Sequence, residues 1–158
     1  MKHRLIAALA AATVLVPSLA FAETRTLDVG SFHGVHAASG IRAVVAGGKP
    51  LSVVADTPNA QDLADLRYEV RDGTLHLWYD WTIADIFEWQ GRDITITIDV
   101  EQLDALDASS GASIQASVLM GEDISLEASS GGSVTTSAVE GVSYSIDASS
   151  GGSVDFPG

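Results

Sequence analysis

A short motif recurs three times in the C-terminal half of the chain, at a fixed spacing of 20 residues. The copies occupy residues 107–114, 127–134 and 147–154, and each contains Ala-Ser-Ser-Gly followed by Ala-Ser or Gly-Ser. Strict repetition of this kind indicates a solenoid or a propeller. A 20-residue unit is too short for a propeller blade or a pair of helices, and the regular leucines of a leucine-rich repeat are missing. The repeat therefore favours one coil of a β-helix.

The residues around each copy alternate between apolar and polar, as a half-buried strand requires. In the third copy, Ile146 and Ala148 fall on one face and Asp147 on the other. The Ser-Gly pair that follows predicts a turn, because glycine accepts positive φ angles. Stacked coils would then form one interior ladder of large side chains and one of small side chains. These ladders are Leu106, Leu126 and Ile146, and Ala108, Ala128 and Ala148.

Stacking also aligns polar groups on the outside of the coils. The carboxylates of Asp107, Glu127 and Asp147 would lie about 4.8 Å apart, where like charges destabilise one another. They either splay into water or hold a cation between them, and the nonapeptide calcium signature is absent. The turn serines are expected to hydrogen-bond along the stack through their hydroxyls. These serines are Ser110, Ser130 and Ser150.

A strand and hairpin region is predicted to precede the solenoid. Asp72-Gly73 favours a tight hairpin turn between two β-rich runs. Thr57 followed by Pro58 predicts the start of a short helix, with Thr57 as its N-cap. Further short strands are predicted at residues 26–29, 41–45, 51–54 and 94–98, the last with isoleucine at every second position.

The first 22 residues have the pattern of a secretory signal peptide. Lys2 and Arg4 precede an apolar run at 5–16, and Ala20-Phe21-Ala22 is an A-x-A cleavage site. The run is too short for a membrane-spanning helix, although an uncleaved N-terminal anchor is the alternative. Cleavage after Ala22 predicts a periplasmic or secreted protein without a membrane span. Residues 23–158 would form a single domain, with repeats at 103–122, 123–142 and 143–158.

The chain is strongly acidic, with 21 Asp and Glu against 8 Lys and Arg and a net charge of −13. DNA phosphates and anionic lipids repel such a chain, which argues against a nucleic-acid partner. The acidity otherwise indicates a neutral or cationic partner, or serves solubility alone. The chain has no cysteine, so an exported fold must hold by burial and backbone pairing.

The order of these features resembles a known bacterial family. Residues 40–45, 51–54, 70–75 and 94–98, followed by the serine-glycine repeats, are similar to the putative auto-transporter adhesin head GIN domain. The resemblance covers roughly residues 26–156. It implies an exported all-β domain of unknown function that folds as a right-handed parallel β-helix-like stack, here with about 20-residue coils. It supplies no catalytic residues to transfer, and we expect no translocator barrel after the repeats.

Motifs for catalysis and cofactor binding are missing from the sequence. It contains no G-x-S-x-G, H-E-x-x-H, Walker or G-x-G-x-x-G pattern. His33 and His36 lie close in sequence, but no neighbouring ligand pattern supports a metal site there. We therefore expect no enzyme activity, no cofactor and no metal site.

Aromatic residues concentrate between Trp78 and Trp89, a segment that holds all three tryptophans. Aromatic faces beside carboxylates suit a sugar-binding surface. The alternative is that the segment caps an exposed end of the stack. Strand parity places Trp78 outward, opposite to Leu75, Leu77 and Tyr79. The candidate ligand-binding residues are Trp78, Trp81, Trp89, Asp85 and Glu88.

These observations favour an exported structural or interaction module of the cell envelope. A carbohydrate-binding module that uses the segment from Trp78 to Trp89 is the alternative function. An envelope protein, a glycan, or a second copy stacked end to end is the expected partner.

The signal peptide can be tested directly. Fractionated cells should yield a periplasmic or secreted product, and N-terminal sequencing should give Glu23 as its first residue. A full-length chain that starts at Met1 and stays in the cytoplasm would contradict this prediction.

Overall fold

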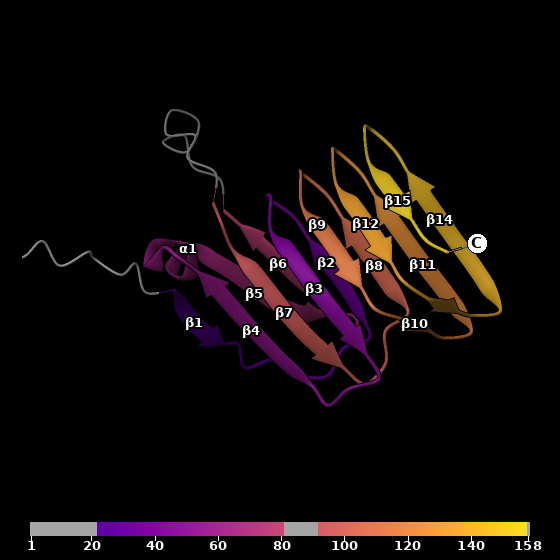
Figure 1. Cartoon of the computed structure of the whole chain (residues 1–158), viewed down its shortest axis with the longest axis horizontal. Coiled ribbons are helices and arrows are strands. Elements are labelled where there is room, and N and C mark those ends of the chain that lie inside the picture. Colours follow the sequence, from indigo (N-terminus) through magenta and orange to yellow (C-terminus); the bar gives the residue numbers. More distant parts are fainter. Residues whose placement is uncertain (1–21, 81–91, 158) are drawn as a thin grey trace, which may run out of the picture.

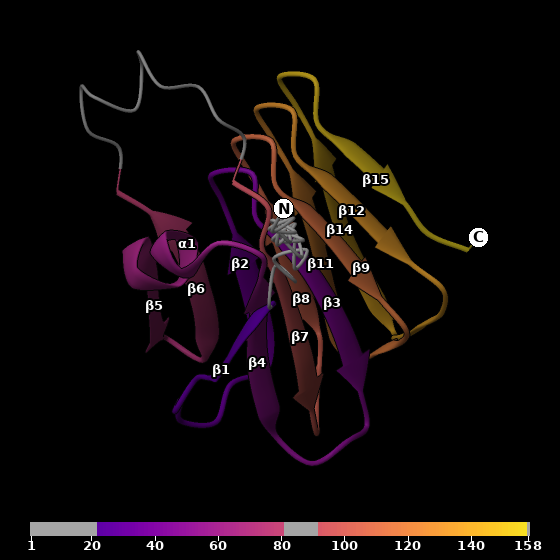
Figure 2. The same ribbon diagram turned by 60° about the vertical axis from the view of Figure 1, so that its left-hand side comes forward.

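A computed structural model describes residues 22–80 and 92–157, which are mostly β-structure in largely parallel sheets. Two large sheets face each other and enclose the apolar core (Figures 1 and 2). The arrangement is consistent with a β-solenoid-like fold. The predicted signal peptide at residues 1–22 lies outside the described residues, apart from Ala22.

The larger sheet has seven strands, and its four pairings from β7 to β15 are parallel. The pairings of β1 with β4 and of β4 with β7 are antiparallel. In spatial order the strands are β1 (Glu23–Thr26), β4 (Ser52–Thr57), β7 (Thr95–Val100), β3 (Arg42–Gly47), β9 (Ser113–Ala116), β12 (Ser133–Thr136) and β15 (Ser153–Asp155).

The second sheet has six strands, and only β5 pairs antiparallel, with β6. A third, two-stranded sheet joins β10 (Leu119–Met120) to β13 (Val139–Glu140) in parallel. In spatial order the strands of the second sheet are β14 (Ser143–Ala148), β11 (Asp123–Ala128), β8 (Ala105–Ala108), β2 (Gly34–Ala37), β6 (Thr74–Tyr79) and β5 (Leu66–Arg71).

The coils do not stack in sequence order. The coil formed by β2 and β3 lies between the coil of β6 and β7 on one side and the coil of β8 and β9 on the other. The upstream region therefore does more than precede the repeats, because its strands belong to the same two sheets. Residues 41–45 and 51–54 both form strands, but β7 separates β3 from β4 in the sheet.

The turn of each repeat has two consecutive residues with left-handed backbone. Ser110 and Gly111 have φ of 50° and 75°, and the later copies have nearly the same values. Ser39 and Gly40 repeat this geometry with φ of 59° and 73°, so the β2–β3 coil carries a fourth Ser-Gly turn. The four turns align along one edge of the stack (Figure 1).

Backbone groups, and not the serine hydroxyls that we expected, link these turns. The N–H of Gly40 donates to the carbonyl of Ser110 at 3.1 Å, and Gly111 donates to Ser130 at 3.1 Å. Gly131 donates to Ser150 at 3.2 Å in the same way. The left-handed glycine turns its N–H toward the next coil. The backbone therefore makes the link that the sequence assigned to the serine hydroxyls.

The two predicted interior ladders are present as in-register rows of side chains. Leu126 pairs in register with Leu106 and Ile146, and Ala128 with Ala108 and Ala148. Val35 and Ala37 extend the two rows into the β2 coil. Leu106 and Leu126 are 1% and 0% exposed, but Ile146 is 41% exposed. Ile146 and Ala148 depart from the interior position expected for them, because no strand follows β14 in the sheet.

Antiparallel strands and a helix close the opposite end of the stack. Helix α1 (Ala60–Asp65) lies there against β4 and β1 (Figure 1), and it buries Leu63. Its N-cap is Asn59, whose side chain accepts from the N–H of Gln61. The prediction of Thr57 as N-cap is wrong by two positions, because Thr57 completes β4.

The hairpin and the isoleucine strand are confirmed. β5 and β6 pair antiparallel, and the residues between them, Asp72 and Gly73, have φ of 52° and 74°. Two consecutive positive φ angles define the turn type that suits a two-residue hairpin. In the isoleucine strand, Ile96 and Ile98 are fully buried and Ile94 is 2% exposed.

Truncation of the interior row should have a strongly position-dependent cost. Leu126→Ala should lower the free energy of unfolding by about 2–5 kcal/mol, because a buried leucine leaves a cavity. Ile146→Ala is the matched control in the same row, and its effect should stay below about 1.5 kcal/mol since the side chain is already exposed. Denaturant titration measures both, and equal losses would contradict this register.

Two adjacent glycines offer a second test. A Cβ on Gly132 would lie 2.1 Å from the carbonyl oxygen of Ala108, so backbone would have to shift. A Cβ on Gly131 meets nothing within 4 Å, and only its φ of +75° opposes substitution. Gly131→Ala should cost about 1–2 kcal/mol and Gly132→Ala about 3 kcal/mol or more in thermal or denaturant unfolding. The reverse order would show that the coils are not in close backbone contact.

Candidate functional site

The last rung of the stack, formed by β14 and β15, is an open end. Among the described residues, each of these two strands has a hydrogen-bonded neighbour on one side only. Every residue of β14 is exposed, whereas the equivalent inward residues of β11, Ile124 and Leu126, are 2% and 0% exposed. The same side-chain pattern is therefore buried where another coil covers it and open where none does.

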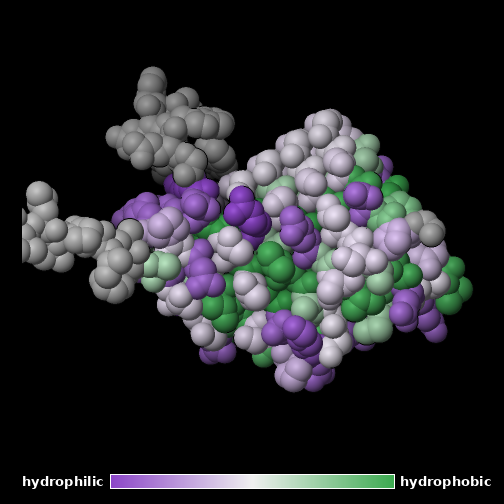
Figure 3. Space-filling model, in the orientation of Figure 1, coloured by the Kyte–Doolittle hydropathy of each residue, from purple (hydrophilic) through white to green (hydrophobic). Residues whose placement is uncertain are grey.

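Apolar side chains gather at this open end. Val142 is 85% exposed, Tyr144 49% and Phe156 37%. Figure 3 shows hydrophobic residues at the surface on this side of the molecule, at the right of the view. An unpaired strand edge beside exposed apolar side chains is the usual arrangement of a surface that accepts a further strand.

The acidic residues of the repeats lie in one row on the outer face. Glu127 pairs in register with both Asp107 and Asp147. Glu127 and Asp147 are exposed, and the side chain of Asp107 is 43% exposed. Within residues 22–80 and 92–157, no group of three or more histidine, aspartate or glutamate side chains is arranged to hold a metal ion. The row reaches the open end and gives it negative charge.

The structure places only one of the five predicted ligand-binding residues. Trp78 lies on the outer face of β6 and is half-buried, and its indole N–H donates to Asp80 Oδ1 at 3.2 Å. Trp81, Asp85, Glu88 and Trp89 lie outside the described residues. In the described part of the chain, β6 ends and β7 begins at the edge where the neighbouring coil has its Ser-Gly turn.

Tyr79 is buried beside the start of this segment. Its ring lies 4.2 Å below the guanidinium of Arg92, a cation–π contact. Burial raises the pKa of the Tyr79 phenol, and the nearby carboxylate of Asp62 adds to the effect. The described residues offer its hydroxyl no hydrogen-bond partner.

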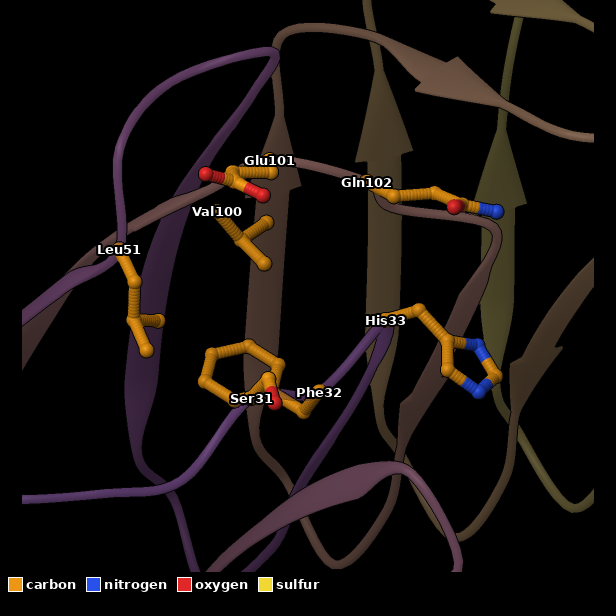
Figure 4. Close-up of a pocket in the computed structure, with 7 residues that line it drawn as sticks. All are labelled: Ser31, Phe32, His33, Leu51, Val100, Glu101 and Gln102. Atoms are coloured by element: carbon orange, nitrogen blue, oxygen red, sulfur yellow. The ribbon is translucent and has the colours of Figure 1, made fainter.

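A shallow hollow of about 320 Å³ lies near the start of β2. Figure 4 shows Phe32, Leu51 and Val100 around it, with the ring of His33 turned to the side. His33 Nδ1 lies 2.7 Å from Asp104 Oδ1, and its other ring nitrogen packs against Gly73. The His33 ring is thus oriented by Asp104, and its side chain is 52% exposed.

His33 and His36, which are close in sequence, face different partners. His36 lies opposite His76 on the neighbouring strand, with the two Nδ1 atoms 3.2 Å apart. Burial lowers the pKa of His76, and the charges of His36 and Arg71 lower it further. No sequence motif predicts this pair, because the stacking of β2 on β6 follows from no local pattern.

Among the described residues, no helix has the length and apolar character needed to cross a membrane.

No curated protein matches the chain. The fold has relatives among solved structures. A putative adhesin from Bacteroides fragilis superposes with a TM-score of 0.71 at 17% identity, covering 85% of this chain and 61% of the other. A putative adhesin from Parabacteroides merdae gives 0.51 at 12% identity, covering 81% and 59%.

These likenesses establish the fold, and the chain spans about three fifths of each relative. A family model extends the comparison to the sequence. It matches residues 31–158 and describes a putative auto-transporter adhesin, head GIN domain. That match includes both large sheets apart from β1, and all the Ser-Gly turns, and the family has no known catalytic activity. The chain belongs to the putative auto-transporter adhesin head GIN domain family.

Proposed function

We propose that this chain is an exported, non-enzymatic interaction module of the bacterial cell envelope, and that its open end binds a protein partner. The family suggests export, and the sequence pattern of residues 1–22 supports a Sec-type signal peptide with release into the periplasm or beyond. The observation that carries the binding proposal is the contrast between Leu126, 0% exposed, and Ile146, 41% exposed, in one row of the stack.

We further infer a right-handed solenoid whose C-terminal coils are about 20 residues long. The in-register pairing of Leu126 with Leu106 and Ile146 supports this coil length. Such a stack needs a cap at each end, because a terminal coil exposes both backbone groups and inward side chains. The partner would supply such a cap at the rung formed by β14 and β15.

The chemistry of the open end specifies the kind of partner. A strand added beside β14 would gain backbone hydrogen bonds from the free edge and cover Tyr144 and Ile146 with its own apolar side chains. Its outward side chain next to Asp147 should be basic, because opposite charges on paired strands stabilise a sheet. An extended segment that alternates apolar residues with lysine or arginine fits these requirements.

A second copy of this chain fits less well in parallel register. Each of its repeat strands would set another carboxylate beside Asp147, as Asp107, Glu127 and Asp147 already stand beside one another. Like charges directly opposite one another destabilise paired strands. Self-association and glycan binding are therefore alternative outcomes of the test and not the proposal.

A synthetic peptide can probe the open end. A peptide with the sequence of β11 and Glu127→Lys should bind the full chain, and about fivefold more tightly than the unaltered acidic peptide. Ile146→Asn should abolish binding of the lysine peptide, since it removes the apolar contact on the inward face. Fluorescence anisotropy of labelled peptide measures the three dissociation constants.

Val44→Asn is the matched control, because Val44 is exposed to nearly the same extent, 39%, but lies on β3 in the middle of the larger sheet. It should leave peptide binding unchanged. Equal binding by the Ile146 and Val44 variants would overturn the proposal, as would a lack of binding to wild type. If analytical sedimentation shows a dimer of the wild-type chain and Ile146→Asn abolishes that dimer, the open end binds a second copy. Glycan-array signals that neither variant changes would favour carbohydrate binding.

A further inference from the structure

Six titratable side chains form one continuous outer row across the second sheet. The register pairs each member with the next on the neighbouring strand. Two histidines lie between carboxylates, so that the row changes from acidic to imidazole and back to acidic. In spatial order the row is Glu69, His76, His36, Asp107, Glu127 and Asp147.

The two histidines meet through the same ring nitrogen. His36 Nδ1 and His76 Nδ1 lie 3.2 Å apart, with ring centroids 5.2 Å apart and planes inclined by 64°. Without a metal ion, one Nδ1–H donates to the other Nδ1. Two nitrogens that bind one Zn²⁺ at about 2.0–2.1 Å stand about 3.3 Å apart in a tetrahedral site and about 2.9 Å apart at a right angle. The observed separation falls between these two geometries.

Neighbouring groups fix the orientation of His36. Its Nε2 lies 3.2 Å from Ser109 Oγ and 3.7 Å from Asp107 Oδ2. A proton on Nε2 can be donated to Ser109 Oγ, with the Asp107 carboxylate nearby but beyond hydrogen-bond distance, and it leaves the lone pair on Nδ1, directed at His76. In metalloproteins the second ring N–H of a metal-binding histidine commonly donates to a neighbouring oxygen, as Nε2 can here to Ser109.

We propose that His36 and His76 form an open two-histidine site for a divalent transition-metal ion such as Cu²⁺ or Zn²⁺. Imidazole ligands favour these ions over Ca²⁺ and Mg²⁺, which prefer oxygen ligands. Within the described residues no third side chain completes the group, so water fills the remaining positions and the affinity is modest. The site is independent of the open end, since β2 and β6 lie in the interior of the stack order.

Burial and nearby charges affect the protonation of His76. Burial and the charges of His36 and Arg71 lower the pKa of His76, while Glu69 and Asp107 act in the opposite direction. A lowered pKa extends the pH range in which His76 is neutral to values below 6.5, and neutral imidazole is the state that a metal ion requires. The net charge of −13 also attracts cations to the surface.

Calorimetric titration of the untagged full chain with Zn²⁺ and with Cu²⁺ tests the site. The reference chain carries His3→Gln, and so does every variant, so that only the three described histidines remain. One ion should bind per chain, and His36→Gln or His76→Gln should each weaken binding at least about tenfold, as for loss of a metal-site contact. His33→Gln is the matched control and should leave the affinity unchanged, because His33 pairs with Asp104 instead.

Two further measurements separate metal binding from a purely structural role of the pair. Electron paramagnetic resonance of bound Cu²⁺ should report two nitrogen ligands in the reference chain and one in His76→Gln. Affinity should fall at least about tenfold from pH 7.5 to pH 5, as protons compete for the imidazoles. Thermal unfolding without metal shows whether the His76→Gln variant is folded. If this variant is folded and binds the metal ion as tightly as the reference chain, the proposal is wrong. Absence of binding to the reference chain would also overturn it, leaving only a hydrogen-bonded pair.

Discussion

In-register backbone pairing between parallel coils is the constraint on which the rest of this structure depends. Each coil must turn at the same place as its neighbours, or the rows of side chains would lose alignment. The Ser-Gly turns meet this requirement with two left-handed residues, and the glycine N–H bonds directly to the serine carbonyl of the next coil. The close approach of Gly132 to the Ala108 carbonyl is part of the same contact.

Alignment of the turns places equivalent residues of successive coils in rows. Each row is apolar or charged according to the side chains that form it. Leucines and alanines make a dry interior with one wide and one narrow row, and the carboxylates make a charged exterior. The histidine pair arises in the same way, because His36 and His76 occupy equivalent outward positions of stacked strands. Chemistry on this fold therefore comes from adjacency between coils and not from adjacency in sequence.

This distinction explains which features the sequence could predict. The three exact copies indicated their own stacking partners, and the alternation around Ile146 indicated which side chains share a face. The fourth turn, at Ser39 and Gly40, escaped because it lies outside the 20-residue period. The pairing of His36 with His76 escaped for the same reason. The exposure of Ile146 could not be read from its motif, since Leu126 has nearly identical neighbours and is buried.

The position of the β2–β3 coil has a consequence for the order of folding. This coil leaves the ribosome first, yet both of its neighbours come from later parts of the chain, at β6–β7 and β8–β9. It cannot bury both sides until those segments have been made, so its contacts are long-range and their formation is slow. The C-terminal coils, in contrast, each add to a neighbour that is already complete. Until the later coils have been made, the two strand edges of the β2–β3 coil have no neighbours, so this coil can be completed only late in folding.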